Sequence, residues 1–170
     1  MKDTSYNEWL KKDYGELIDA LEVSELQKRF MRSRWLDQVM WMESKCKNMQ
    51  RWYYILRLTA IIGGVIVPTL ITQAYNYPAT ILSVLVAVSV AVEEFFHFGE
   101  RWRHYRQSVE LLKIQAWQFF QLSGPYQSFT CHGAAYSVFA AKVEEIMQNE
   151  VNVYISEIVK EKKEKNKKDC

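Results

Sequence analysis

Polar side chains recur at helical spacing where a long apolar segment of the sequence ends. Glu93, His97, Glu100 and His104 stand four, three and four residues apart, and Ser89 precedes Glu93 by four. In one continuous helix this spacing places all of them along one face. Carboxylates and imidazoles on one face can bind cations or line a wet path for them. The sequence therefore predicts pore-lining or ion-binding residues at Ser89, Glu93, His97 and Glu100.

Two other interpretations compete for the same residues. The first is a solvated helix face just outside a membrane, which explains Glu100 and His104 as well as a pore does. Glu93 lies closer to the apolar segment, so for this residue we favour a role in ion passage. A transition-metal site is the second alternative, but carboxylate and histidine sites in helical bundles take ligands from several helices. No second helix offers a matching Glu-x-x-His. We therefore expect no metal site and no cofactor.

Arg57 and Glu94 form a candidate structural pair. Counted outward from Asn76 they are nearly equidistant, so the two arms of an antiparallel helical hairpin would bring them to one level. We expect an ion pair there, with the Arg57 side chain reaching toward lipid headgroups.

These residues border two apolar segments, residues 55–75 and 79–98, which are joined by the turn Asn76-Tyr77-Pro78. Each segment has about 20 residues, which as a helix spans roughly the 30 Å hydrocarbon core of a bilayer. The overall composition, 49% hydrophobic and 25% charged, is that of an ordinary globular protein. Locally, however, no charged residue or histidine occurs from Leu58 to Val92, whereas a hairpin of a soluble protein would show a polar stripe. The sequence predicts a transmembrane helical hairpin.

Basic residues stand at the outer ends of both apolar segments, and the connecting turn has none. Because Lys and Arg beside spans stay in the cytoplasm, we expect a multi-pass protein of the inner, cytoplasmic membrane with both termini cytoplasmic. The first apolar segment begins too far along the chain for a signal peptide. The net charge of +2 says little about partners, and the Lys-rich stretch from Lys160 to Lys168 is expected to be a solvated helix end.

Apolar residues at intervals of three or four predict long helices on both sides of the hairpin. Before the hairpin they form an apolar stripe that includes Trp35, Val39, Met42 and Cys46. Ser24 and Gln27 predict a capping box that opens this helix, which we expect to continue without a break into the first apolar segment. Gly124-Pro125 predicts a helix stop. The expected fold is an all-α membrane protein, a two-span transmembrane helical hairpin extended into a cytoplasmic helical bundle. We expect cytoplasmic N-terminal helices over 1–52, the hairpin over 53–98, and cytoplasmic helices with a basic tail over 99–170.

Small residues recur in both apolar segments and predict close packing between the two spans. The first has Ala60, Gly63 and Gly64, and the second has Ser83, Ala87 and Ala91 together with Glu94 on one side. Small side chains let helices approach closely in lipid.

No catalytic constellation occurs in the sequence. There is no nucleophile elbow, no P-loop, no dinucleotide-binding glycine pattern and no zinc-ligand spacing. Cys46, Cys131 and Cys170 lie far apart and are expected to be free thiols. We therefore expect that the protein is not an enzyme.

Four motifs follow one another in the second half of the sequence. They are Arg101-Trp102-Arg103-His104-Tyr105-Arg106, Glu110 with Leu112-Lys113, Gly124-Pro125-Tyr126, and Glu144-Glu145-Ile146 with Glu150. Their order and spacing resemble the signature of the DUF4231 family, which belongs to the SLATT group of two-span bacterial proteins. The similarity extends from about Trp35 to Tyr154, with Gln115 where an acid is expected and Tyr154 where a Trp is common. The resemblance implies a membrane effector that forms pores or disturbs the bilayer.

These expectations combine into one hypothesis and two alternatives. A single hairpin cannot enclose a pore, so we expect a homo-oligomeric, cation-permeable ion channel or effector with Glu93 near its cytoplasmic mouth. Its partners would be membrane lipids, ions and further copies of the chain. A cytoplasmic regulatory protein is a further possible partner, and we expect no nucleic acid. The alternatives are a non-conducting membrane-anchored helical scaffold and a lipid-perturbing effector.

Overall fold

The computed structural model describes the backbone of residues 2–168 and the side chains of residues 6–153 and 155. Within these residues every regular element is helical, which confirms the all-α expectation. The chain forms two compact units, one from Met1–Met42 with Gln107–Cys170 and the other from Glu43–Arg106.

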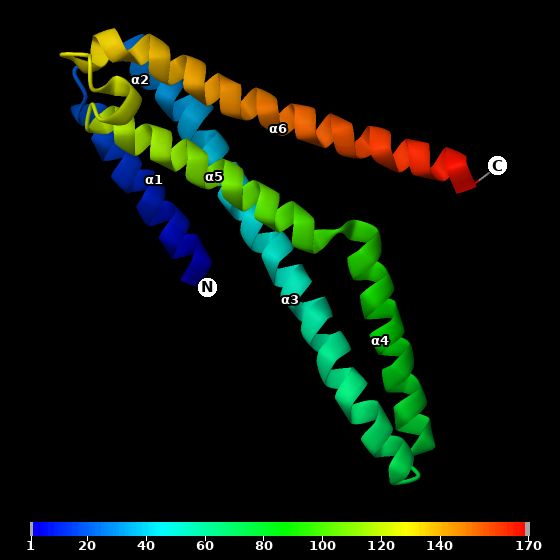
Figure 1. The fold of residues 1–170 in the computed structure, drawn as a ribbon. Helices are drawn as coiled ribbons and strands as arrows, with labels where there is room; N and C mark the ends of the chain where they lie inside the picture. The colour runs from blue at the N-terminus through cyan, green and yellow to red at the C-terminus, as the bar shows by residue number, and fades with distance from the viewer. Residues whose placement is uncertain (1, 169–170) are drawn as a thin grey trace. The chain divides into compact units, whose positions relative to one another are not determined.

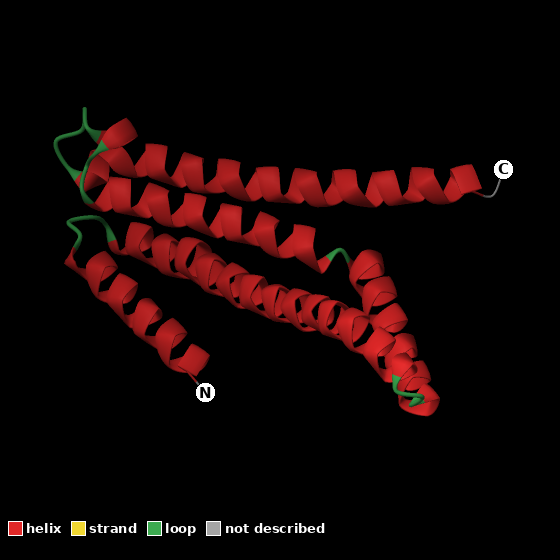
Figure 2. Cartoon of the chain, turned by 60° about the horizontal axis from the view of Figure 1, so that its bottom comes forward, coloured by secondary structure: helices red, strands yellow, loops and turns green. Residues whose placement is uncertain are grey.

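The helices follow one another with short connections (Figures 1 and 2). A run of helix without a break extends over residues 25–72, as the sequence predicts. In chain order the elements are α1 (Lys2–Ala20), α2 (Glu25–Phe30), the π-helix η1 (Met31–Leu36), α3 (Asp37–Thr72), α4 (Asn76–Phe96), α5 (Phe98–Phe120), the 3-10 helix η2 (Gly124–Tyr126) and α6 (His132–Lys168).

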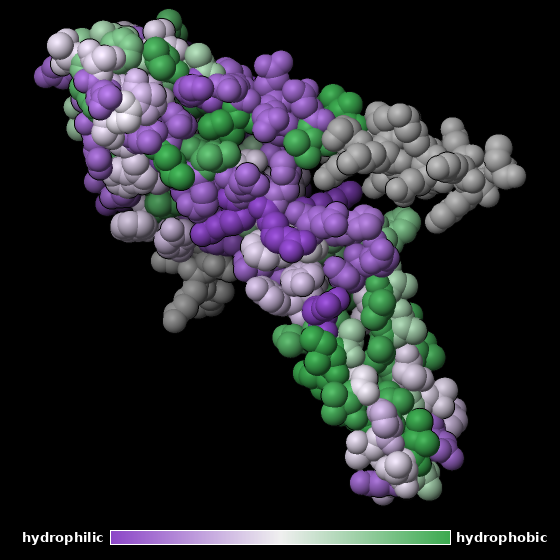
Figure 3. All heavy atoms as spheres, in the orientation of Figure 1, coloured by the Kyte–Doolittle hydropathy of each residue, from purple (hydrophilic) through white to green (hydrophobic). Residues whose placement is uncertain are grey.

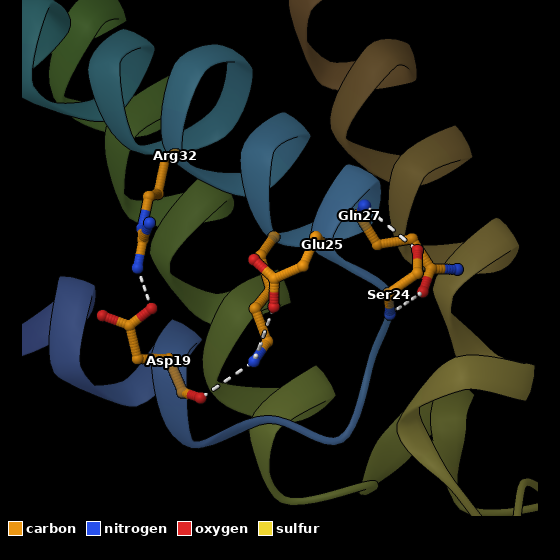
Figure 4. Close-up of polar contacts among 6 residues, drawn as sticks. Asp19, Ser24, Glu25, Gln27 and Arg32 are labelled. Atoms are coloured by element: carbon orange, nitrogen blue, oxygen red, sulfur yellow. Dashed lines mark hydrogen bonds and ion pairs between the residues drawn. The ribbon is translucent and has the colours of Figure 1, made fainter.

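The predicted capping box opens this run of helix. The Ser24 hydroxyl accepts a hydrogen bond from the backbone N–H of Gln27 at 3.3 Å, and the Gln27 side-chain oxygen accepts one from the backbone N–H of Ser24 at 2.9 Å (Figure 4). Each bond satisfies a backbone donor that has no partner within the helix.

The π-helix η1 was not predicted from the sequence. At its end the backbone N–H of Asp37 donates to the carbonyl of Arg32, five residues earlier. At its start the Ser33 hydroxyl donates to the Arg29 carbonyl at 2.8 Å. A serine that binds the carbonyl four residues back competes with the α-helical ladder, which helps to explain why the helix widens here.

Trp35, on η1, lies at the centre of the core of the first unit. Its ring is fully buried, and its indole Nε1 donates to the carbonyl of Leu112 on α5 at 3.1 Å. The ring centroid of Tyr14 on α1 lies 5.2 Å away, in an edge-on arrangement. On the other side of the core, Phe119 of α5 stacks on Phe139 of α6 with ring centroids 4.5 Å apart. One aromatic core thus joins all the long helices of this unit.

Polar contacts help to attach α6 to the rest of the unit. Arg34 on η1 donates two parallel hydrogen bonds of 2.8 Å each to the two carboxylate oxygens of Glu144. These bonds hold the pKa of the Glu144 carboxyl below its usual value. Farther along α6, the Ser108 hydroxyl of α5 donates to Glu150 at 2.5 Å.

The stop at Gly124-Pro125 is confirmed, because α5 ends at Phe120 and Gly124 has a positive φ of 57°. The Tyr126 hydroxyl donates to the Gln115 side chain at 2.8 Å, and burial raises the pKa of Tyr126 to about 12. A neutral amide is a suitable acceptor for a tyrosine that stays protonated. Gln115 therefore has a structural role at the position where an acid is expected.

Candidate functional site

The second unit contains the hairpin formed by the end of α3 and by α4, which lie side by side (Figure 1). The connecting turn is at residues 73–75 rather than at the predicted Asn76-Tyr77-Pro78. Ala74 takes a left-handed conformation there, with φ of 62°. Pro78 does not break the chain direction but lies in the first turn of α4, where its missing N–H has no helical partner to lose.

Both helices are long and apolar enough to cross a membrane, with mean hydropathies of 2.0 and 1.9 over their most apolar windows. Only 6% and 11% of those windows are buried in the single chain. Figure 3 shows the hydrophobic residues gathered over the hairpin. The side chains of Val65 and Ile81 are among those exposed. Water is a poor solvent for a surface of this kind, so the hairpin requires lipid or protein to cover it.

The two hairpin helices meet closely at Gly63. A Cβ on this glycine would lie 2.3 Å from a methyl carbon of Val86 and 3.7 Å from one of Leu82. Leu82, Val86 and Ser89 follow one another at helical spacing, so the same face of α4 carries all three toward α3.

Ser89 accordingly lies on the inner face of the hairpin and is 8% exposed. This placement does not support the prediction that Ser89 lines a pore, because α3 covers it in the single chain. The prediction of intrachain packing through Ser83, Ala87 and Ala91 is wrong, since all three are exposed on the outer side of α4. The sequence of an almost uniformly apolar helix gives little information about which of its faces packs against a neighbour. In this hairpin the fit to Gly63 determines which face of α4 packs against α3.

The stripe predicted over one continuous helix is divided at His97. α4 ends at Phe96, His97 takes a left-handed conformation with φ of 49°, and α5 begins at Phe98. His97 and Glu100 are exposed, whereas His104 is half-buried. Histidine is among the side chains that adopt positive φ more often than most, but a helical wheel cannot reveal such a break.

Glu93 lies beside the start of α5. A Cβ on the buried Gly99 would lie 3.5 Å from a carboxylate oxygen of Glu93 and 2.8 Å from the ring of Tyr53. The first backbone N–H groups of a helix carry partial positive charge, which favours a carboxylate at that end. Glu93 is half-buried in this position. The geometry allows it to stabilise the junction between α4 and α5 as well as to attract a cation.

Arg57 and Glu94 are both exposed, on α3 and α4 respectively. The ion pairs found among the described side chains do not include one between these two residues. Their pairing stays a prediction.

A buried carboxylate at Glu43 was missed by the sequence reasoning. Its side chain is only 3% exposed, and it lies 3.5 Å from the Arg106 guanidinium and 4.0 Å from the Lys47 ammonium. One turn farther along α3, the Cys46 thiol donates to the Trp102 carbonyl at 3.4 Å. The signal in the sequence was an acid directly beside the apolar stripe of α3. These contacts join α3 to α5 outside the apolar part of the hairpin.

The described cysteines are free thiols, with Cys46 buried and Cys131 exposed, which confirms the prediction for these two. Cys170 lies outside the described residues. Within the part of the chain that the structure describes, no three His, Cys, Asp or Glu side chains are grouped so that they could hold a metal ion.

A family described as a protein of unknown function, DUF4231, matches residues 37–134, which is more than half of the chain. The matched segment contains the whole hairpin and the Gly124-Pro125-Tyr126 motif, whereas the acidic pair Glu144-Glu145 lies beyond it. Comparisons with curated proteins and with solved structures found no match. The chain belongs to the DUF4231 family.

Proposed function

We propose that the protein is an integral membrane protein whose hairpin crosses the inner membrane and returns, with both termini in the cytoplasm. The observation that carries this proposal is that only 6% and 11% of the most apolar windows of two adjacent helices are buried, in a stretch of chain with no charge between Leu58 and Val92. Exposed tryptophan and tyrosine side chains support it, because Trp52 and Tyr54 precede the first span, Tyr75 stands at the turn and Tyr77 at the start of α4. Such residues favour the two interfaces of a bilayer.

Within this membrane placement, we propose that several copies assemble into a cation-permeable pore with Glu93 near the cytoplasmic mouth. Ser83, Ala87 and Ala91 support an assembly, since these exposed small residues would let another helix approach closely. The carboxylates of Glu93 and Glu94 stand at the end of α4 that faces the cytoplasm in this topology. A ring of such carboxylates attracts cations. No enzymatic step is part of this proposal.

Conductance measurements test the pore directly. Purified protein in a planar bilayer should pass current, and a potassium chloride gradient should give a reversal potential that indicates preference for the cation. Glu93→Gln should reduce that preference, because it removes a negative charge from the mouth. Glu22→Gln, an exposed acid in the first unit, is the matched control and should leave the preference unchanged. Unchanged selectivity in Glu93→Gln would remove Glu93 from the ion path, and a monomer in lipid would exclude the pore.

A membrane-anchored scaffold is the second candidate, and exposed apolar residues on the first unit favour it. Leu111, Ile114 and Trp117 follow one another at intervals of three residues on α5, each more than 40% exposed. A scaffold of this kind should give no current but should retain a soluble partner through that face. Leu111→Gln with Ile114→Gln should then release the partner. Release of dyes of many sizes from vesicles would instead indicate a lipid-perturbing effector.

A further inference from the structure

A groove of about 600 Å³ lies within the first unit. One wall is α1, with Lys11 and Gly15, and the other is the run of helix formed by α2, η1 and the start of α3. The volume falls in the range of pockets that hold small ligands. The groove takes no part in the function proposed above.

Gly15 has no evident structural reason to be a glycine. It lies inside α1, where glycine is less stable than alanine. It does not have a positive φ, and a Cβ built on it would meet no atom within 4 Å. Packing therefore does not require the missing side chain. A large side chain at this position would, however, occupy space in the groove.

The opposite wall contains the π-helix η1, which contributes Arg32, Ser33 and Leu36 to the groove. A π-helical turn is less favourable than an α-helical one and often occurs at functional sites. Two locally unfavourable features, Gly15 and η1, thus face the same cavity from different helices.

Three cations from three elements line the groove. Lys11 lies 3.4 Å from Asp37, and Arg32 is paired with Asp19 (Figure 4). These carboxylates hold the two cations in place along the walls. Arg29 takes part in none of the ion pairs found among the described side chains. Glu25 also lines the groove, and it lies 3.6 Å from Lys28.

We propose that this groove binds a small phosphate-bearing molecule, with Arg29 and Arg32 as its main contacts and Lys11 as a third cation. A guanidinium matches the geometry of phosphate oxygens with two parallel hydrogen bonds. A doubly charged phosphate can compete with the single carboxylates of Asp19 and Asp37 for Arg32 and Lys11. Gly15 leaves the space that the rest of the ligand occupies.

Isothermal titration calorimetry of the full chain with sodium pyrophosphate tests the proposal. The protein is held at low salt in dodecyl maltoside micelles, because this detergent contains no phosphate. We expect saturable binding by the native chain. Arg29→Gln and Arg32→Gln should each weaken it by about tenfold or more, since each removes charge-assisted hydrogen bonds. Gly15→Leu should abolish binding by filling the groove, whereas Gly15→Ala should retain it.

Lys11 and Lys12 provide a matched pair of substitutions on α1. Both lysines are exposed and both changes to Gln remove one positive charge, but only Lys11 lines the groove. Lys11→Gln should weaken binding several-fold and Lys12→Gln should not. Circular dichroism of each variant verifies that it is folded, and the arginine and lysine variants remain informative if Gly15→Leu does not fold.

Competition experiments identify the source of the phosphate. If glycerol phosphate displaces pyrophosphate as well as phosphatidic acid does, the ligand is a soluble phosphate ester. If phosphatidic acid alone displaces it, the ligand is a lipid headgroup. Absence of saturable binding in the native chain, or equal weakening by Lys11→Gln and Lys12→Gln, would overturn the proposal.

Discussion

A methyl carbon of Val86 lies so close to Gly63 that a Cβ added to this glycine would be only 2.3 Å from it. Gly63→Ala should therefore push α3 and α4 apart and destabilise the hairpin by about 1–3 kcal/mol. Gly64→Ala is the control, because a Cβ on Gly64 meets nothing within 4 Å. Thermal unfolding of both variants in detergent measures the difference. Equal stability of the two would mean that the helices are not packed as described.

The bidentate contact between Arg34 and Glu144 should make stability depend on pH. Because the contact lowers the pKa of Glu144 in the folded chain, its contribution is present above the ordinary carboxyl pKa of 4.5 and is lost as the pH falls below it. Both side chains are about half exposed, at 47% and 48%, so solvent screening limits the contribution to less than about 1 kcal/mol.

The measurement is the unfolding free energy of the native chain and of Arg34→Gln across this range. We expect the native chain to be the more stable at neutral pH and the two curves to converge in acid. A constant difference at every pH would show that the ion pair is not responsible.

Trp35→Phe should lower the stability of the first unit by about 1–3 kcal/mol. The substitution removes the hydrogen bond from Nε1 to the Leu112 carbonyl and leaves space where the indole was buried. Chemical denaturation followed by circular dichroism gives the value. Trp41→Phe, at an exposed tryptophan of the same helical run, should have a much smaller effect.

Gly15→Ala should stabilise the protein by roughly 0.5–1 kcal/mol, because alanine restricts the unfolded chain and suits a helix interior. No neighbouring atom opposes the added methyl group. A shift of the unfolding midpoint to higher temperature is the expected result. A loss of stability would show that the glycine is needed for packing and does not serve to keep the groove open.

Features set by neighbouring residues were predicted well from the sequence. The capping box at Ser24 and Gln27 and the stop at Gly124-Pro125 form from residues within a few positions of each other. The apolar stripe that contains Trp35 and Val39 lies in the core because its period is that of a helix.

Features set by contacts between distant residues were not predictable in this way. The face that α4 turns to α3 depends on the fit at Gly63, and an apolar helix has no polar side to orient it. The left-handed conformation of His97 and the π-helix at Met31–Leu36 change the register of a helical wheel without a Pro or Gly to mark them. Arg34 and Glu144 are 110 residues apart, so only the fold brings them together.

Labelling of single cysteines tests most directly whether the hairpin crosses a membrane. In a variant that lacks the native cysteines, Tyr75→Cys places a thiol at the turn, and Ser44→Cys and Arg103→Cys place one beyond each span. In intact bacterial cells, a membrane-impermeant maleimide should label the thiol at position 75 alone. The thiols at positions 44 and 103 should be labelled only after the cells are permeabilised. If position 75 is labelled only after permeabilisation, like the other two, the hairpin does not cross the bilayer.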